Sequence, residues 1–230
     1  MNPTEVEANK VAGHSEHLLA FCIALVRKAK IADALLMKSF GSTFDRPFAS
    51  TGFEVAREAI YFSVVRDLAA IIYDKDKRTP SVVSCLEKLK KPDIVGYFRD
   101  LFVEEPGVET ALKKRLEADN SLRFKKLISN FLFEAEDLVA SEKAKACLVT
   151  RNEFVAHYQL NPSEGGYIRP DIAQFGLTWG TPKAVIEQLV PIVEAISVIT
   201  RNTGFAWQIY DEQNEKIVND LVLALGGSAS

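Results

Sequence analysis

Hydrophobic residues recur at intervals of three and four positions along most of the chain, which is the period of an α-helix. This spacing predicts a first long helix from about Glu5 to Ser39 and a second from about Phe53 to Tyr73. The segment 40–52 between them is rich in glycine, serine and threonine and is expected to be a loop, with Thr51 capping the second helix. No stretch alternates with a period of two over enough residues to predict a sheet. The pattern therefore predicts an all-α protein.

Prolines and small polar residues predict the helix boundaries in the rest of the chain. Boundaries of this kind predict helices over 81–89, 92–102, 108–119, 121–158 with a kink near Ser141, 181–210 and 213–225. The segment from Asn161 to Gly180 contains two prolines and four glycines and is expected to be the longest non-helical stretch.

The length of 230 residues is sufficient for one helical domain that buries a core of its own. We expect a single domain over residues 1–225, built as a bundle of long antiparallel helices with extra short helices. The short helices would form an insertion at about 80–119. Residues 226–230 are expected to form a flexible tail.

Composition and charge exclude several classes of protein. A hydrophobic content of 47% with 26% charged residues excludes an intrinsically disordered chain. The net charge of -3 argues against a protein that coats nucleic acid non-specifically, although it leaves room for a local basic groove. The longest apolar run, 18–26, is shorter than the roughly 20 residues that a bilayer requires. Acidic residues precede that run where a signal peptide carries basic ones. We therefore expect a cytoplasmic protein with no membrane partner.

The motifs of common cofactor and metal sites are missing. The three cysteines are far apart and form no CxxC pair, which indicates reduced thiols and argues against a disulfide framework or a zinc site. The chain contains no glycine-rich phosphate loop, no HExxH and no calcium-binding loop. The sequence thus predicts neither a cofactor nor a metal.

One constellation of polar residues stands apart, the segment Arg151-Asn152-Glu153-Phe154-Val155-Ala156-His157 near the end of the long helix. On an α-helix, six residues turn through about 600°, so Arg151 and His157 would lie about 120° apart around the axis and about 9 Å apart along it. A partly buried polar cluster is one interpretation. A helix end with a structural arginine and a capping histidine is the alternative that the residue types alone leave open.

This segment resembles the signature of HEPN domains, which are all-helical domains of prokaryotic toxins and defence proteins, many of them RNases. Its Arg-Asn start and Ala-His end resemble the branch related to the abortive-infection U-type proteins. Arg66-Asp67 and the charged run 73–78, followed by Pro80-Ser81, are similar to the middle section of that branch. The likeness covers roughly Glu54 to Tyr158. One position departs from it, because many members carry Lys where this chain has Glu153.

The resemblance implies a HEPN-like helical bundle that acts as a metal-independent endoribonuclease, in phage defence or as a toxin. His157 would transfer protons, since an imidazole pKa of about 6.5 lies near ambient pH. Arg151 would bind the phosphate with two parallel hydrogen bonds, and Asn152 would orient either His157 or the scissile phosphate. The resemblance also implies a homodimer that brings two copies of the motif together. RNA and an antitoxin protein are the other expected partners.

A basic stretch before the motif is the candidate RNA-binding surface. Phosphate contacts by such residues would make binding sensitive to salt. The proposed RNA contacts are Lys113, Lys114, Arg115, Arg123, Lys125 and Lys126, together with Tyr158 at the end of the motif. A solvated helix face is the alternative for the basic stretch. Two other functions stay open: a non-catalytic HEPN-like module that binds a nucleotide, RNA or a protein, and a helical interaction protein that carries the motif by accident.

Overall fold

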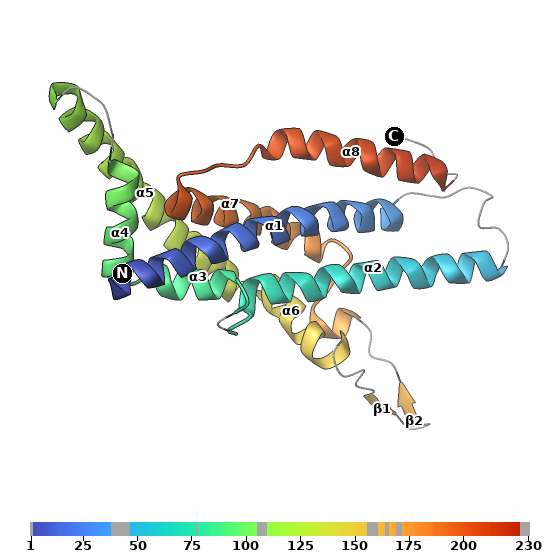
Figure 1. The fold of residues 1–230 in the computed structure, drawn as a ribbon. Helices are drawn as coiled ribbons and strands as arrows, with labels where there is room; N and C mark the ends of the chain where they lie inside the picture. Colours follow the sequence, from blue (N-terminus) through green and yellow to red (C-terminus); the bar gives the residue numbers. More distant parts are fainter. Residues whose placement is uncertain are drawn as a thin grey trace. The chain divides into compact units, whose positions relative to one another are not determined.

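The computed structural model describes residues 2–37, 47–76, 78–104, 110–155, 161–163, 166–168 and 172–225. Nearly all of these residues are helical, which confirms the all-α prediction (Figure 1). The elements in chain order are α1 (Pro3–Met37), α2 (Pro47–Tyr73), α3 (Val82–Leu89), α4 (Pro92–Val103), α5 (Thr110–Ala140), α6 (Glu142–Thr150), the π-helical turn η2 (Arg151–Val155), β1 (Asn161–Ser163), β2 (Gly166–Ile168), the 3₁₀ turn η3 (Ile172–Phe175), α7 (Thr181–Arg201) and α8 (Trp207–Ala224). No helix in these described ranges is long and apolar enough to cross a membrane.

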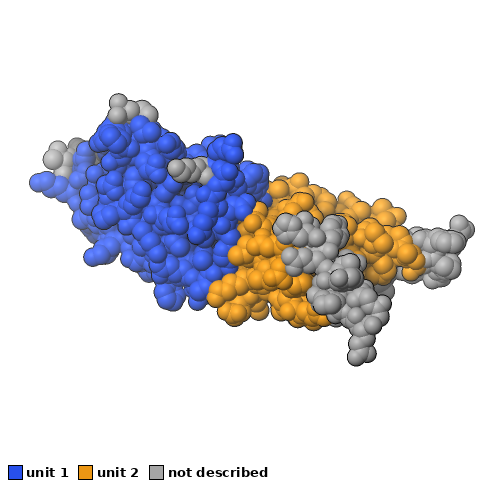
Figure 2. Space-filling view, turned by 90° about the horizontal axis from the view of Figure 1, so that it is seen from below, with its two compact units in different colours: residues 1–22, 71–141, 188–205 blue, residues 23–70, 142–187, 206–230 orange. Residues whose placement is uncertain are grey.

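The chain divides into two compact units (Figure 2). Unit 1 comprises Met1–Cys22, Ile71–Ser141 and Gln188–Phe205. Unit 2 comprises Ile23–Ala70, Glu142–Glu187 and Ala206–Ser230. The long helices α1, α2 and α7 each contribute residues to both units.

Unit 1 is built around α5. The short helices α3 and α4 pack against α5 and against each other. The ring of Phe102 on α4 lies 5.4 Å from the ring of Phe124 on α5. The Tyr73 hydroxyl, at the end of α2, donates a hydrogen bond of 3.0 Å to the Val139 carbonyl near the end of α5. The largest buried side chains of this unit include Leu18, Ile72, Leu89, Ile94, Phe98, Phe124, Phe131 and Leu138.

Unit 2 holds α8 against α1 through polar and apolar contacts. The Tyr210 hydroxyl donates to the Ile23 carbonyl at 2.5 Å, and the Arg27 guanidinium lies 5.3 Å from the centre of the Tyr210 ring. Arg27 Nε also donates to Oδ1 of the buried Asn214 at 3.0 Å. Ala34 on α1 packs with Val218 and Val222 on α8. These contacts fix α8 along the second half of α1.

Several predicted boundaries are confirmed. α4 begins at Pro92, where the missing amide hydrogen of proline is least harmful. Ser81 caps α3, since its Oγ accepts a hydrogen bond of 3.1 Å from the Ser84 amide. The predicted kink near Ser141 is a break in the helix, because α5 ends at Ala140 and α6 begins at Glu142.

Two predicted boundaries are wrong because helix continues through residues that usually end it. α2 begins at Pro47, so Thr51 and Gly52 lie inside the helix and Thr51 does not cap it. Gly52 is exposed there, and helix tolerates such a glycine at a loss of about 1 kcal/mol. α5 likewise runs without interruption through Asn120 and Ser121, which were expected to begin a new helix.

The boundary between the last two helices is also corrected. α7 ends at Arg201, and Asn202 has a left-handed conformation with φ of 51°. Asparagine adopts this conformation more readily than most residues, and it commonly ends helices. The Ser197 hydroxyl then donates to the Thr203 carbonyl at 2.7 Å, which stabilises the turn before α8 begins at Trp207.

The predicted non-helical segment contains a small antiparallel ribbon, so the expectation of no sheet is wrong at this point. β1 pairs with β2 in the register Asn161 to Ile168 and Ser163 to Gly166. Each strand has three residues, which is too short for an alternating pattern to be recognised in the sequence.

Candidate functional site

The predicted motif begins directly after α6, a short helix that is firmly anchored in unit 2. Ala144, Ala146, Cys147 and Thr150 are the buried residues of α6. The Thr150 hydroxyl donates to the Ala146 carbonyl at 2.8 Å, so the last polar side chain before the motif is satisfied within its own helix. Burial raises the pKa of the Cys147 thiol to about 12, which keeps it neutral. Arg151 therefore follows directly on a helix that is packed within unit 2.

The motif starts as a π-helical turn at Arg151–Val155, where an α-helix was predicted, and residues 156–160 lie outside the described residues. Residues Arg151–Val155 form this turn, in which each amide bonds five residues back. A π turn has more residues per turn than an α-helix, so the rotation of about 100° per residue does not hold for Arg151–Val155. Isolated π turns are rare in proteins as a whole, and those that occur are often found at functional sites.

Arg151 and Asn152 are brought together by this turn. Arg151 Nε donates to Asn152 Oδ1 at 3.3 Å. The Arg151 residue is half-buried, whereas Asn152 and Glu153 are exposed. The contact fixes one edge of the guanidinium against a solvent-facing amide, which restricts the orientations that the cation can adopt.

Two of the predicted site residues, His157 and Tyr158, lie outside the described residues. The relation of Arg151 to His157 therefore stays a prediction. The tripeptide Thr200-Arg201-Asn202, which repeats the start of the motif, lies in unit 1 at the end of α7. There the Arg201 Nη2 donates to Ser197 Oγ at 2.8 Å, as expected for a helix-end cation.

The chain returns to α6 after the ribbon through η3 and a tight turn at Gly176. η3 packs against α6. Gly176 has a φ of 75°, and a Cβ added to it would lie 3.7 Å from the Ala146 Cβ. The next residue, Leu177, is buried. α6, the helix that precedes the motif, is thus covered by a turn that requires glycine.

An exposed aromatic residue follows this turn, and the sequence analysis did not identify it. Trp179 is 44% exposed, and its ring lies edge-on against Tyr61 of α2 with centroids 4.7 Å apart. The Tyr61 hydroxyl donates to the Thr178 carbonyl at 2.8 Å. Burial raises the pKa of Tyr61 well above its ordinary value and Cys147 adds to the rise, so the hydroxyl stays protonated. The signal for this residue was a lone tryptophan inside the longest non-helical stretch.

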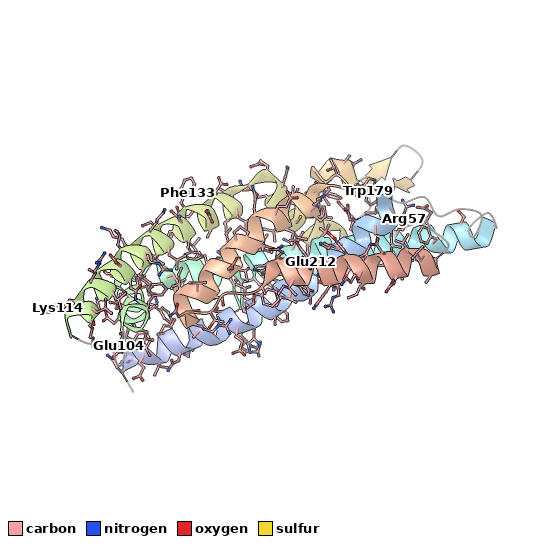
Figure 3. The ribbon with its side chains drawn as sticks, turned by 90° about the horizontal axis from the view of Figure 1, so that it is seen from above. Arg57, Glu104, Lys114, Phe133, Trp179 and Glu212 are labelled. Carbon is pink, nitrogen blue, oxygen red and sulfur yellow. The ribbon has the colours of Figure 1, made fainter. Side chains whose placement is uncertain are left out.

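The predicted RNA-binding lysines and arginines of α5 do not lie on one face of the helix. With about 100° per residue, Lys114 and Lys125 share one side, while Arg123 and Lys126 lie on another side. These four side chains are exposed (Figure 3 labels Lys114). Lys113 is half-buried and forms an ion pair of 3.8 Å with Glu117. Arg115 is also exposed and lies about 20° from Lys126, so the exposed cations spread over about half of the circumference of α5.

The comparisons with known proteins identify a family. The HEPN family described as AbiU2 matches residues 8–221, which is nearly the whole chain. No curated protein and no solved structure matches the chain. Within the described ranges, no three His, Cys, Asp or Glu side chains gather in an arrangement that would hold a metal ion.

Proposed function

Because the chain belongs to the AbiU2 family of HEPN domains, we propose that it is a metal-independent endoribonuclease that acts in phage defence or as a toxin. The observation that carries the proposal is the setting of Arg151. Arg151 is half-buried and begins a π turn at the end of a packed helix, and its Nε donates to Oδ1 of the exposed Asn152 at 3.3 Å. Such a cation suits a phosphate that approaches from solvent.

The proposed reaction is an internal transfer at phosphorus. The 2′-oxygen of one ribose attacks the adjacent phosphorus while the bond to the 5′-oxygen breaks, which gives a 2′,3′-cyclic phosphate and a 5′-hydroxyl. The 2′-hydroxyl loses a proton and the 5′-oxygen gains one, and His157 is the group assigned to this proton transfer. Arg151 stabilises the charge that develops on the phosphoryl oxygens, and Asn152 holds the guanidinium in place.

The reaction uses one proton acceptor and one proton donor at the same time. The motif supplies a single histidine in each chain. A homodimer that brings two motifs to one two-fold axis would provide both groups, since an isologous contact places two copies of each residue there. We therefore include a homodimer in the proposal. For a protein that acts as a toxin, the proposal also includes an antitoxin protein that blocks this site.

RNA contacts are assigned to Trp179, Tyr158 and the side of α5 that carries Lys114 and Lys125. Trp179 lies in unit 2 with the motif, and exposed indole rings stack on unpaired bases. Figure 3 labels Trp179 together with Arg57, which precedes Tyr61 by one turn of α2. RNA binding is expected to quench the fluorescence of Trp179 in a Trp207→Phe background. The quenching should be lost in a Trp207→Phe/Trp179→Phe protein that keeps its circular dichroism spectrum.

Glu153 supports a second candidate, a HEPN module that binds a nucleotide, RNA or a protein without cleaving RNA. Its carboxylate is exposed beside Arg151 and forms no ion pair with a side chain of the described residues. An unpaired anion next to a phosphate site weakens phosphate binding. Under this candidate, Glu153→Lys would tighten RNA binding while cleavage stays absent.

The test is cleavage of RNA by the purified protein in EDTA, with a matched pair of arginine variants. Lysine cannot make the paired hydrogen bonds of arginine, so Arg151→Lys is expected to lower turnover by about 10²-fold. Arg201→Lys changes the same residue in the same Thr-Arg-Asn sequence and should cleave like the wild type. Equal turnover of the two variants would remove Arg151 from the site. Binding without cleavage would assign the second candidate.

A further inference from the structure

A groove on the surface of unit 1 lies between α5 and α7 and has a volume of about 230 Å³. Its lining residues are Phe133, Glu134, Asp137, Leu138, Gln188, Pro191 and Ile192. Pockets that hold drug-sized ligands are larger, with volumes of about 300–1,000 Å³. The groove therefore fits a small and slender ligand.

The apolar part of the groove combines core residues with an exposed aromatic ring. Leu138 and Ile192 are each 1% exposed, so they line the groove from the core of the unit. Phe133 is 73% exposed, the highest value among the large hydrophobic side chains of the described residues (Figure 3). A phenyl ring in this position offers its face to a ligand, and aromatic faces attract organic cations.

Two carboxylates of the groove give it a negative charge. Glu134 and Asp137 are exposed and form no ion pair with a side chain of the described residues. Glu136, by contrast, is paired with Lys90 at 2.6 Å. Glu134 and Asp137 are three residues apart in the sequence, which places them about 4.5 Å apart along the axis of α5 and about 60° apart around it. They can therefore receive two separate cationic groups of one ligand.

These lining groups do not suit a metal ion or an anion. Among the residues that the structure describes, no three His, Cys, Asp or Glu side chains gather as metal ligands. Two carboxylates beside an apolar surface do not supply the roughly six oxygen ligands that magnesium or calcium takes. A phosphate group would be repelled by both carboxylates. A ligand with an apolar body and a cation at each end, however, matches the ring, the core residues and both charges.

We propose that this groove binds an aliphatic diamine or polyamine. The methylene chain packs against Phe133, Leu138 and Ile192, one ammonium group pairs with Glu134, and a second pairs with Asp137. The Phe133 ring also attracts the nearer ammonium group through its face. The motif belongs to unit 2, so this site in unit 1 does not depend on the proposed nuclease.

Titration calorimetry with 1,4-diaminobutane tests the ligand class. At constant ionic strength, 1,4-diaminobutane is expected to bind about 3-fold more tightly than butylamine, because its second ammonium group forms a second ion pair. Magnesium chloride at an equal concentration should not displace it, since a compact hydrated dication has no apolar body for the groove. Butylamine that binds as tightly as the diamine would show a site for a single ammonium group and would overturn the inference. Displacement by magnesium would show attraction to charge alone and would also overturn it.

Three variants test the site itself. Glu134→Gln/Asp137→Asn is expected to lower the affinity for 1,4-diaminobutane by about 10-fold, because both ion pairs are lost. Phe133→Ser should lower it by about 3-fold with no change in charge. The matched control is Asp119→Asn/Glu212→Gln, which removes two charges from exposed carboxylates outside the groove and should keep the wild-type affinity. Circular dichroism checks that all variants fold. Absence of binding to the wild type, a control that loses as much affinity as the groove variant, or an unchanged Phe133→Ser protein would overturn the inference.

Discussion

Replacing Gly176 by alanine tests the turn that covers α6, the helix that precedes the motif. Gly176 has a φ of 75°, a conformation that disfavours a residue with a Cβ by about 1–2 kcal/mol. The added Cβ would lie 3.7 Å from the Ala146 Cβ, which is an ordinary contact, so the steric term is small. The substitution also stabilises by about 0.4–1 kcal/mol through the unfolded chain. The free energy of unfolding should therefore fall by about 1 kcal/mol.

Gly52→Ala is the matched control for this prediction. Gly52 lies inside α2, and a Cβ added to it would meet nothing within 4 Å. Alanine is favoured over glycine in a helix by about 1 kcal/mol, so this variant should be more stable than the wild type. Urea unfolding followed by circular dichroism measures both. Gly176→Asn should lose less stability than Gly176→Ala, because asparagine tolerates positive φ. If both alanine variants are stabilised equally, the left-handed conformation at Gly176 is refuted.

Two further predictions concern the cap of α3 and the buried thiols. Ser81→Ala should lower the free energy of unfolding by about 1–2 kcal/mol. The reason is that Ser81 Oγ accepts a hydrogen bond from the Ser84 amide at 3.1 Å and donates one to the Asp74 carbonyl at 2.5 Å. Ser84→Ala keeps both hydrogen bonds and should show no comparable loss in urea unfolding. Burial raises the pKa of the cysteine thiols from 9.0 to about 12, so the folded protein keeps protons that the unfolded chain releases above pH 9, and stability should fall as pH rises from 9 towards 12. The urea midpoint should drop less between pH 8 and pH 10 in a variant with alanine at all three positions, and an identical drop would contradict the assigned burial of Cys22, Cys85 and Cys147.

The hydrophobic period was sufficient to predict the helices but not all of their ends. α4 follows the prediction because proline is tolerated best in the first turn of a helix, where its missing amide hydrogen leaves no hydrogen bond broken. α5 passes through Asn120 and Ser121 because the helix period continues past them to the buried Phe124 and Ile128, and this continuity overrides their weak helix propensity. The end of α7 depends on the hydrogen bond from Ser197 to Thr203, a contact that the sequence pattern alone does not reveal.

The candidate site was predicted as residues but not as geometry. The sequence identified Arg151 and Asn152, and the structure joins them by a hydrogen bond. No feature of the sequence indicated the π turn that begins at Arg151, because a π turn is set by local hydrogen bonding and not by the hydrophobic period. Trp179 was missed for a different reason: its ring is held by Tyr61, a residue far away in the sequence.

The central claim is RNA cleavage by the histidine of the motif, and the end groups of the product test it most directly. Purified protein should cut RNA in the presence of EDTA and leave 2′,3′-cyclic phosphate and 5′-hydroxyl ends. His157→Ala should lower this rate by about 10²–10⁴-fold, whereas alanine at the exposed His17 should leave it unchanged. Cleavage that stops in EDTA, or a His157→Ala protein as active as the wild type, would contradict the account.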